Sequence, residues 1–166
     1  MSHTSTACSN LVLLHVFLAQ AAGLLTGKHR KDGNVATGRF KDNTNYLPRF
    51  YTDANFQAVE LIRAACDEEG ISMVEATFRW MLRHSALEPD TDGLLLGASS
   101  VAQLEENLAA CKAAAEKGPL SHHLLDAFDE AWSITKQGAF PYWRSYSADH
   151  PFREALDQGA SYTVKK

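Results

Sequence analysis

The sequence has few of the residues and motifs that mark metal centres, disulfide frameworks and common hydrolase sites. Its three cysteines, Cys8, Cys66 and Cys111, lie far apart and form no CxxC pair, so neither a zinc site nor a disulfide framework is indicated. The seven histidines show no HExxH spacing, and we expect no bound metal. No GxSxG element is present, so no Ser-His-Asp catalytic set can be assigned.

Long apolar runs and an excess of positive charge are also absent. Residues 11–22 are the most apolar segment, but they are too short for a membrane span and lack the basic region of a signal peptide. The net charge of -4 argues against a nucleic-acid surface that depends on bulk charge. The basic residues 28–31 form either a local phosphate contact or a solvated loop. We therefore expect a cytoplasmic protein with no membrane or nucleic-acid partner.

The composition that is present suits a soluble domain, with 45% hydrophobic and 22% charged residues in a chain long enough to bury a core. Residues 1–10 are small, polar and without pattern, which predicts disorder. Residues 11–18 are continuously apolar, which is typical of a buried parallel strand. Residues 21–27 contain two glycines and predict a loop that approaches another group closely. Residues 28–53 predict a long irregular segment.

Apolar spacing and capping residues then predict two consecutive helices. In residues 54–69 apolar side chains recur every three or four positions, with Asp53 as the N-cap and Gly70 ending the helix. Ser72 begins the second helix, and Glu75 completes a capping box. The positions expected to be buried in these helices are Phe56, Val59, Ile62, Cys66, Met73, Thr77, Trp80, Met81 and His84.

The second half of the chain predicts a short strand and two further helices. Residues 89–93 predict a turn, and residues 94–96 a short buried strand. Ser100 begins a helix that a Gly-Pro pair closes, and residues 120–136 form the last helix. The side chains expected to point inward are Val101, Leu104, Leu108, Cys111 and Ala115 in the first of these helices and Leu124, Leu125, Phe128 and Trp132 in the second.

This order of elements is a β/α alternation, and its all-apolar strands are typical of a parallel sheet. Two strands do not form a stable sheet alone, so the pattern indicates part of a larger α/β protein. The most informative junction is residues 94–107, LLLGASSVAQLEEN, where an apolar run ends at a glycine and two serines precede a helix. The unpaired N–H groups at such a helix start attract an anion such as phosphate.

Three segments together resemble the C-terminal part of the aldo-keto reductases. They are residues 22–28 (AGLLTGK), 72–81 (SMVEATFRWM) and 96–108 (LGASSVAQLEENL), in the family's order. The branch they resemble most is that of the aflatoxin-aldehyde (succinic semialdehyde) reductases, and the voltage-gated potassium channel beta subunits are relatives. The resemblance implies a helix-rich α/β fold, a partial (β/α)8 TIM barrel holding the last two β/α units and the C-terminal helix. The domain would comprise residues 11–144, and residues 145–166 would form a tail.

The same resemblance implies that the chain binds NADPH. The residues that would cradle the adenosine 2′-phosphate and the adenine are Gly97, Ser99, Gln103, Glu106 and Asn107. Those that would wrap the pyrophosphate are Leu24, Thr26, Gly27 and Lys28, with Lys28 as the ionic contact. Without the resemblance two plainer interpretations stay open, a capped helix with solvated polar side chains and a flexible surface loop.

The resemblance further implies a pocket for acidic substrates that contains Arg49 and Arg144. Guanidinium groups hold carboxylates through two parallel hydrogen bonds, and Tyr46 is a further candidate for the lining. In the family, a tyrosine supported by Lys, Asp and His protonates the carbonyl oxygen, and all four come from the first half of the barrel. No residue of this sequence matches them, so we assign no catalytic residue.

Two functional hypotheses follow. The first is an NADPH-dependent reductase of aldehydes or ketones, present as a truncated form that lacks the catalytic tetrad and is inactive alone. The alternative is a non-catalytic NADP-binding or partner-binding fragment. A small aldehyde or ketone would be the substrate where the full barrel is present, and a homo-oligomer is a further alternative.

Overall fold

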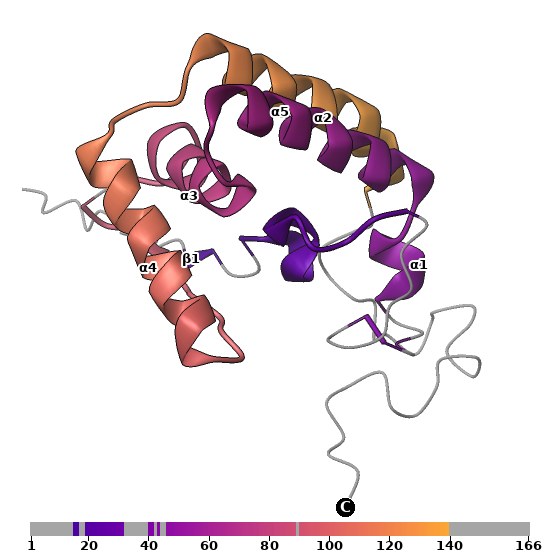
Figure 1. The fold of residues 1–166 in the computed structure, drawn as a ribbon, viewed down its shortest axis with the longest axis horizontal. Coiled ribbons are helices and arrows are strands. Elements are labelled where there is room, and N and C mark those ends of the chain that lie inside the picture. Colours follow the sequence, from indigo (N-terminus) through magenta and orange to yellow (C-terminus); the bar gives the residue numbers. More distant parts are fainter. Residues whose placement is uncertain are drawn as a thin grey trace, which may run out of the picture.

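The computed structural model describes residues 15–16, 19–31, 40–41, 43, 46–88 and 90–139. Helices dominate the part of the chain that it describes, and the strands there are very short (Figure 1). The expectations for residues 1–10, for Arg144 and for residues 145–166 lie outside the described residues. Among the helices described, none has the length and apolar character needed to cross a membrane.

The two described strands form a parallel pair. β1 (His15–Val16) lies beside β2 (Gly93–Leu94), with His15 opposite Gly93 and Val16 opposite Leu94. The Leu95 N–H continues the pairing by donating to the Val16 carbonyl at 2.9 Å. The predicted parallel direction is correct, but the predicted burial of residues 94–96 is wrong at Leu95, whose side chain is 54% exposed. Successive side chains of a strand point to opposite faces, so Leu95 faces away from the core against which Leu94 packs.

Helix α2 (Asp53–Glu69) begins one residue earlier than the sequence predicts. Its N-cap is Thr52 and not Asp53, because the Thr52 hydroxyl oxygen accepts a hydrogen bond from the Asn55 N–H at 3.2 Å. Thr52 has the extended backbone that an N-cap requires, whereas Asp53 is already helical. Gly70 ends the helix with a φ of 67°, as predicted. The predicted buried positions of this helix are confirmed: Phe56, Val59, Ile62 and Cys66.

Helix α3 (Met73–Arg83) is capped by Ser72 as predicted, and the Ser72 hydroxyl oxygen accepts from the Glu75 N–H at 3.0 Å. The Glu75 carboxylate contacts Arg79 and Lys117 instead of completing the capping box. In Figure 1 helix α3 lies between other helices of the chain. Its buried residues therefore occupy more of its surface than the single apolar stripe that the sequence predicts. Its buried residues are Met73, Val74, Ala76, Thr77, Phe78 and Arg79, whereas Trp80, Met81 and His84 are half-buried.

Helix α4 (Val101–Glu116) is capped by Ser100 as predicted, but the side chains expected to point inward are largely exposed. Val101, Leu104 and Leu108 are 73%, 40% and 52% exposed. The buried residues of α4, which packs against α3, are Asn107, Ala110, Ala113 and Ala114. Small side chains let two helix axes approach closely. The alanine face of α4 is therefore the one that packs against α3, and the larger aliphatic side chains of α4 remain exposed.

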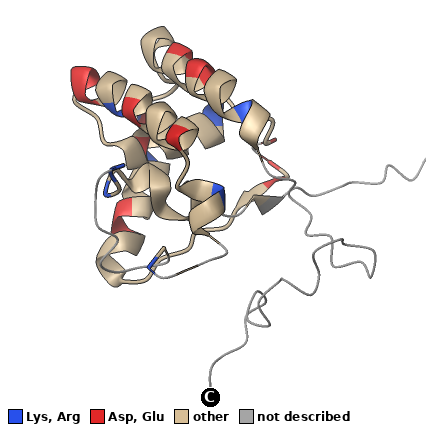
Figure 2. Ribbon diagram, turned by 90° about the vertical axis from the view of Figure 1, so that its right-hand side faces the viewer, with Lys and Arg blue, Asp and Glu red and all other residues tan. Residues whose placement is uncertain are grey.

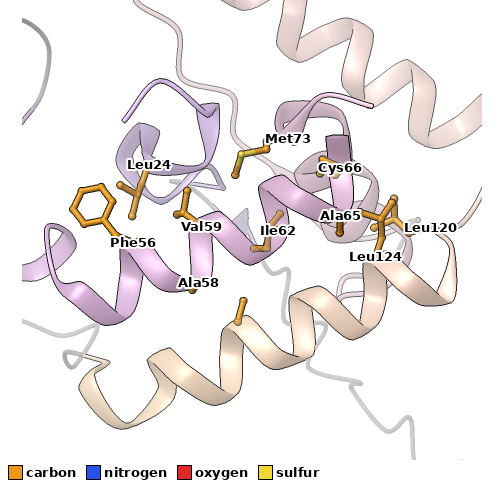
Figure 3. Packing of buried hydrophobic residues seen from close by; sticks show 12 residues of the cluster. Leu24, Phe56, Ala58, Val59, Ile62, Ala65, Cys66, Met73, Leu120 and Leu124 are labelled. Carbon is orange, nitrogen blue, oxygen red and sulfur yellow. The ribbon is translucent and has the colours of Figure 1, made fainter. Parts of the chain in front are cut away.

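Helix α5 (His122–Thr135) packs along α2 and closes the main core (Figures 1 and 3). Leu124 is fully buried there, and the Phe128 ring stacks on Trp80 with ring centroids 5.8 Å apart. The prediction that Trp132 points inward is wrong, because this side chain is 59% exposed and Ala131 takes the buried position. The core residues labelled in Figure 3 come from η1 (Ala21–Thr26), α2, α3, α5 and the loop before α5, and they are Leu24, Phe56, Ala58, Val59, Ile62, Ala65, Cys66, Met73, Leu120 and Leu124.

Two segments that the sequence predicts as irregular contain short helical turns. Residues 21–27 hold the 3-10 helix η1 (Ala21–Thr26), which is kinked where Ala22 and Gly23 have φ values of 60° and 109°. Residues 28–53 hold α1 (Leu47–Phe50), and a second 3-10 turn, η2 (Lys136–Gly138), follows α5. Such short turns show no apolar periodicity over several turns, which is the signal that predicts helices from sequence.

Candidate functional site

The carboxyl ends of β1 and β2 open into one cavity of about 590 Å³. Because the strands are parallel and paired, the segments that follow them reach the same edge of the sheet. Residues within the stretch 19–29 form one wall, among them Gln20, Thr26 and Lys28, and residues 95–99 with Gln103 and Asn107 of α4 form another. Of the predicted cofactor residues, those that line this cavity are Thr26, Lys28, Gly97, Ser99, Gln103 and Asn107. Its volume is in the range of small-molecule sites, roughly 300–1,000 Å³.

Side chains at the start of α4 already form hydrogen bonds with the donors of this turn. The Ser100 hydroxyl oxygen accepts from the Gln103 N–H at 3.2 Å, which caps the helix. The Gln103 side-chain oxygen in turn accepts from the Ser99 N–H at 2.7 Å and from the Ser99 hydroxyl at 3.0 Å. A carboxamide oxygen therefore already accepts from both Ser99 donors at this helix start. At the same turn, a Cβ on Gly97 would meet no atom within 4 Å, so packing within the described chain does not require glycine there.

Asn107 connects the two walls of the cavity from inside. Its side chain is 1% exposed, its amide NH₂ donates to the Gly97 carbonyl at 3.2 Å, and its oxygen accepts from the Gln20 side chain at 3.1 Å. A buried amide group requires such partners, because leaving it without a hydrogen bond lowers the stability of the fold by roughly 1–3 kcal/mol. Asn107 thus holds the turn after β2 against the segment after β1.

Lys28 supplies positive charge on the other wall, next to His29. His29 lies against Tyr51, whose hydroxyl is 2.6 Å from His29 Nδ1. Burial and the neighbouring Lys28 charge lower the pKa of His29. These surroundings favour the neutral form of the His29 imidazole.

Three of the predicted cofactor residues are not among the described residues that line the cavity. Leu24 is 3% exposed and belongs to the main core. Gly27 has a φ of 77° and presents its carbonyl to Arg63. Glu106 is exposed on α4.

The predicted substrate residues are not brought to this cavity by the described part of the structure. Tyr46 precedes α1 and stacks on Phe50 with ring centroids 5.6 Å apart, and Arg49 lies in α1, where its carbonyl accepts from the Asn55 side chain at 3.2 Å. Neither is among the described lining residues, and Arg144 lies outside the description.

Gln20, His29 and Phe78 also line the cavity. Sequence reasoning missed Gln20 and Phe78, and it included His29 only as part of the basic segment 28–31. Gln20 directly follows an apolar run and His29 stands in a basic segment, but neither pattern specifies a partner distant in the sequence. Phe78 belongs to an apolar helix stripe, for which core packing is the simplest interpretation.

A second cavity of about 580 Å³ lies between α2, α3 and α5 and has an apolar lining. Its wall includes the half-buried Trp80 and Phe128 together with Thr77, whose buried hydroxyl has no hydrogen-bond partner. Over residues 46–88, 90–139 and the shorter described stretches, no group of three His, Cys, Asp or Glu side chains is arranged to hold a metal.

The sequence pattern of the aldo/keto reductase family matches residues 9–130. Aldo-keto reductase family 7 member A3 of Homo sapiens is 39% identical over an alignment of 141 residues that covers 78% of this chain and 41% of that protein. Aflatoxin B1 aldehyde reductase member 2 of Homo sapiens is 39% identical over an alignment of 135 residues that covers 75% of this chain and 36% of that protein. Aflatoxin B1 aldehyde reductase member 4 of Homo sapiens is 40% identical over an alignment of 125 residues that covers 69% of this chain and 37% of that protein.

The chain thus spans less than half the length of these relatives. The family match covers most of the chain. It is consistent with the two paired parallel strands and with the helices packed around them. The chain belongs to the aldo/keto reductase family, as a fragment of its TIM-barrel domain.

Proposed function

We propose that this chain supplies the cofactor-binding part of an NADPH-dependent aldo-keto reductase. The observation that carries the proposal is the cavity shared by the carboxyl ends of β1 and β2, where Lys28 and Ser99 lie on walls that come from different β/α units. Bound NADPH would supply the hydride, and a small aldehyde or ketone would accept it in a complete barrel. A cytoplasmic location suits the free thiols of Cys66 and Cys111.

The donor set of the cavity suits a phosphorylated dinucleotide. Lys28 is a cation that directly follows Gly27, the left-handed residue that ends η1, and it would contact the pyrophosphate. Ser99 offers a hydroxyl and a backbone N–H beside Gly97, where the absence of a side chain lets a ligand approach the backbone closely. These groups would hold the adenosine 2′-phosphate.

Binding at this helix start would require Gln103 to move. Its side-chain oxygen already accepts from the Ser99 N–H and hydroxyl, so a phosphate must displace it. A charged phosphate forms stronger hydrogen bonds than a neutral carboxamide does, and this difference favours the exchange. Gln103 is then free to contact the nucleotide from the next turn of α4.

We also propose that the chain does not reduce carbonyls alone. Proton transfer to a carbonyl oxygen requires an acid within hydrogen-bond reach of it. The tyrosines in the described residues, Tyr46 and Tyr51, lie among aromatic side chains, and Tyr51 is hydrogen-bonded to His29. A complete site therefore needs groups beyond these tyrosines.

Fluorescence titration of the purified chain with NADPH tests the binding proposal. Lys28→Ala should weaken NADPH binding about tenfold or more, because a hydrogen bond to a charged group contributes about 1.5–3 kcal/mol. Lys31→Ala is the matched control, since Lys31 pairs with Asp53 at 3.1 Å and is not among the described lining residues. Equal affinities of both variants and the unaltered chain would overturn the role of Lys28.

Turnover separates the two parts of the proposal. With NADPH and a small aldehyde, the absorbance of the reduced nicotinamide should remain at the level of a heat-inactivated control. Steady oxidation of NADPH above that control would overturn the proposal that the chain is inactive alone. Absence of NADPH binding by the unaltered chain would overturn the cofactor proposal.

A second candidate function is that of a non-catalytic partner-binding fragment. The exposed aliphatic side chains of α4, Val101, Leu104 and Leu108, favour it, because contiguous exposed apolar residues mark association surfaces. Both candidates predict NADPH binding without turnover, so concentration-dependent association of the purified chain is the result that would support this one.

A further inference from the structure

The backbone on both sides of Lys28 is held by one side chain from a distant helix. Arg63, in α2, donates from Nη1 to the Gly27 carbonyl at 2.9 Å and from Nη2 to the His29 carbonyl at 3.3 Å. The two carbonyls flank Lys28 directly. Arg63 therefore fixes the peptide group between Gly27 and Lys28 and the one between His29 and Arg30, across 34 to 36 residues of sequence.

The surroundings of Arg63 favour this geometry. Its side chain is only 12% exposed, so water competes little for its donors. Gly27 has a φ of 77°, and a Cβ at that position would lie 3.4 Å from Arg63 Nη1. The left-handed backbone of Gly27, which suits glycine best, thus accompanies the contact between its carbonyl and the guanidinium.

Arg63 has a third contact on its outer side. Its Nε donates to both carboxylate oxygens of Glu60, at 3.3 and 3.2 Å, and Glu60 also accepts from Arg30 at 3.4 Å. Glu60 and Arg30 are more than half exposed, and exposed ion pairs contribute little to stability. The two carbonyl contacts are therefore the part of the network that restrains the Lys28 segment.

The restraint has a direct electrostatic consequence. A carbonyl oxygen bound to Arg63 cannot at the same time face an anion in the cavity, where it would repel phosphate. In a trans peptide the N–H points opposite to the carbonyl, so the Lys28 N–H points away from Arg63. Lys28 itself lines the cavity, whereas Arg63 is not among its described lining residues.

We propose that Arg63 is a positioning residue for the phosphate contact of Lys28, acting through the Gly27 and His29 carbonyls. This inference rests on the proposed function, since it requires that Lys28 meets the pyrophosphate of a dinucleotide. Because Arg63 already orders the Lys28 segment in the free chain, less conformational entropy is lost when the ligand binds. It contributes affinity for a ligand that reaches Lys28 and none for a ligand held only at the helix start of α4.

The test compares two ligands on the full chain. NADP⁺ carries both the pyrophosphate and the 2′-phosphate, whereas adenosine 2′-monophosphate carries only the latter. Arg63→Met, which keeps the volume and removes the donors, should weaken NADP⁺ binding about tenfold and leave adenosine 2′-monophosphate within about twofold. Arg63→Lys, which retains one donor group, should give an intermediate loss. Isothermal titration calorimetry measures both ligands.

Two further variants make the outcome decisive. Glu60→Gln leaves both carbonyl contacts of Arg63 in place and should bind both ligands as the unaltered chain does. Adding Arg63→Met to Lys28→Ala should weaken NADP⁺ no further, because the two residues act through one contact. Circular dichroism monitors folding, and if the methionine variant unfolds, the lysine variant carries the comparison.

Two results would overturn the inference alone. One is unchanged NADP⁺ affinity in the folded Arg63 variants, and the other is an equal loss for both ligands, which indicates general damage to the structure. Failure of the unaltered chain to bind either ligand would instead overturn the proposed function, and with it the inference.

Discussion

The side-chain amides of Gln20 and Asn107 join the two β/α units of the chain, with Gln20 Nε2 3.1 Å from Asn107 Oδ1. Gln20 lies after β1, and Asn107 is buried in α4. Asn107 also donates to the Gly97 carbonyl, so one side chain holds both walls of the candidate site. The same contact connects the stability of the fragment to the shape of its cavity.

Asn107→Ala should therefore lower the free energy of unfolding by about 1–3 kcal/mol, because it leaves the Gly97 carbonyl and the Gln20 amide without this partner. Urea unfolding followed by circular dichroism measures the loss. Gln20→Ala should lower the free energy of unfolding by a smaller amount, since Gln20 is only half-buried and the contact between Asn107 and Gly97 remains. A larger loss for Gln20→Ala than for Asn107→Ala would contradict this account.

Stability should fall as the pH drops below the ordinary histidine value of 6.5. His84 Nε2 accepts a hydrogen bond from the Leu120 N–H at 2.9 Å, and burial and the charges of Arg79 and Arg83 lower its pKa. Between the lowered pKa and 6.5 the unfolded chain binds more protons, so acidification favours unfolding until the folded-state pKa is passed.

His84→Gln isolates this contribution, because a glutamine oxygen can accept from the same N–H but does not titrate. The variant should show a shallower loss of stability with acidification in urea unfolding at several pH values. The remaining slope should include His29, whose pKa is lowered in the same direction, first by burial and then by Lys28. An unchanged slope would show that His84 is not a source of the pH dependence.

The two described thiols should react at different rates with an alkylating reagent. Cys66 is 1% exposed, and burial, with the charges of Asp67, Glu69 and Glu75, raises its pKa to about 12. Because the thiolate is the reactive form, Cys66 should be alkylated only as the chain unfolds, and more slowly than the half-buried Cys111. Peptide-level mass spectrometry resolves the two sites. Faster labelling of Cys66 than of Cys111 in the native chain would contradict the packing of α2.

The exposed apolar side of α4 should promote self-association. Replacing Leu104 and Leu108, which are 40% and 52% exposed, by glutamine should lower the average mass in sedimentation equilibrium and leave the unfolding temperature nearly unchanged. Ala110→Leu on the opposite face is the contrasting variant, because overpacking against α3 should cost about 1–3 kcal/mol. If the glutamine variant is as unstable as the leucine variant, the assignment of the two faces is wrong.

The candidate site could be predicted in part. The glycine and serines at the start of α4 and the lysine after the kinked turn carry the resemblance to the family, and residues such as Lys28 and Ser99 do lie on one cavity. The hydrogen bond from Arg63 to the Gly27 carbonyl could not be predicted, because the position of an arginine on a helix does not indicate a partner 36 residues away. The substrate residues stay predictions, since Tyr46 and Arg49 are among aromatic and backbone contacts near α1 and not among the described lining residues.

The sequence by itself determined the N-caps of α3 and α4 and the glycine that ends α2. Ser72, Ser100 and Gly70 act on N–H and carbonyl groups within a few residues, so their roles follow from local order alone. Only the tertiary structure decided which face of α4 is buried, because that choice depends on the side chains that α3 presents to it. Leu104 and Leu108 are the more hydrophobic, but the alanines fit closer to α3, and close packing determined the outcome.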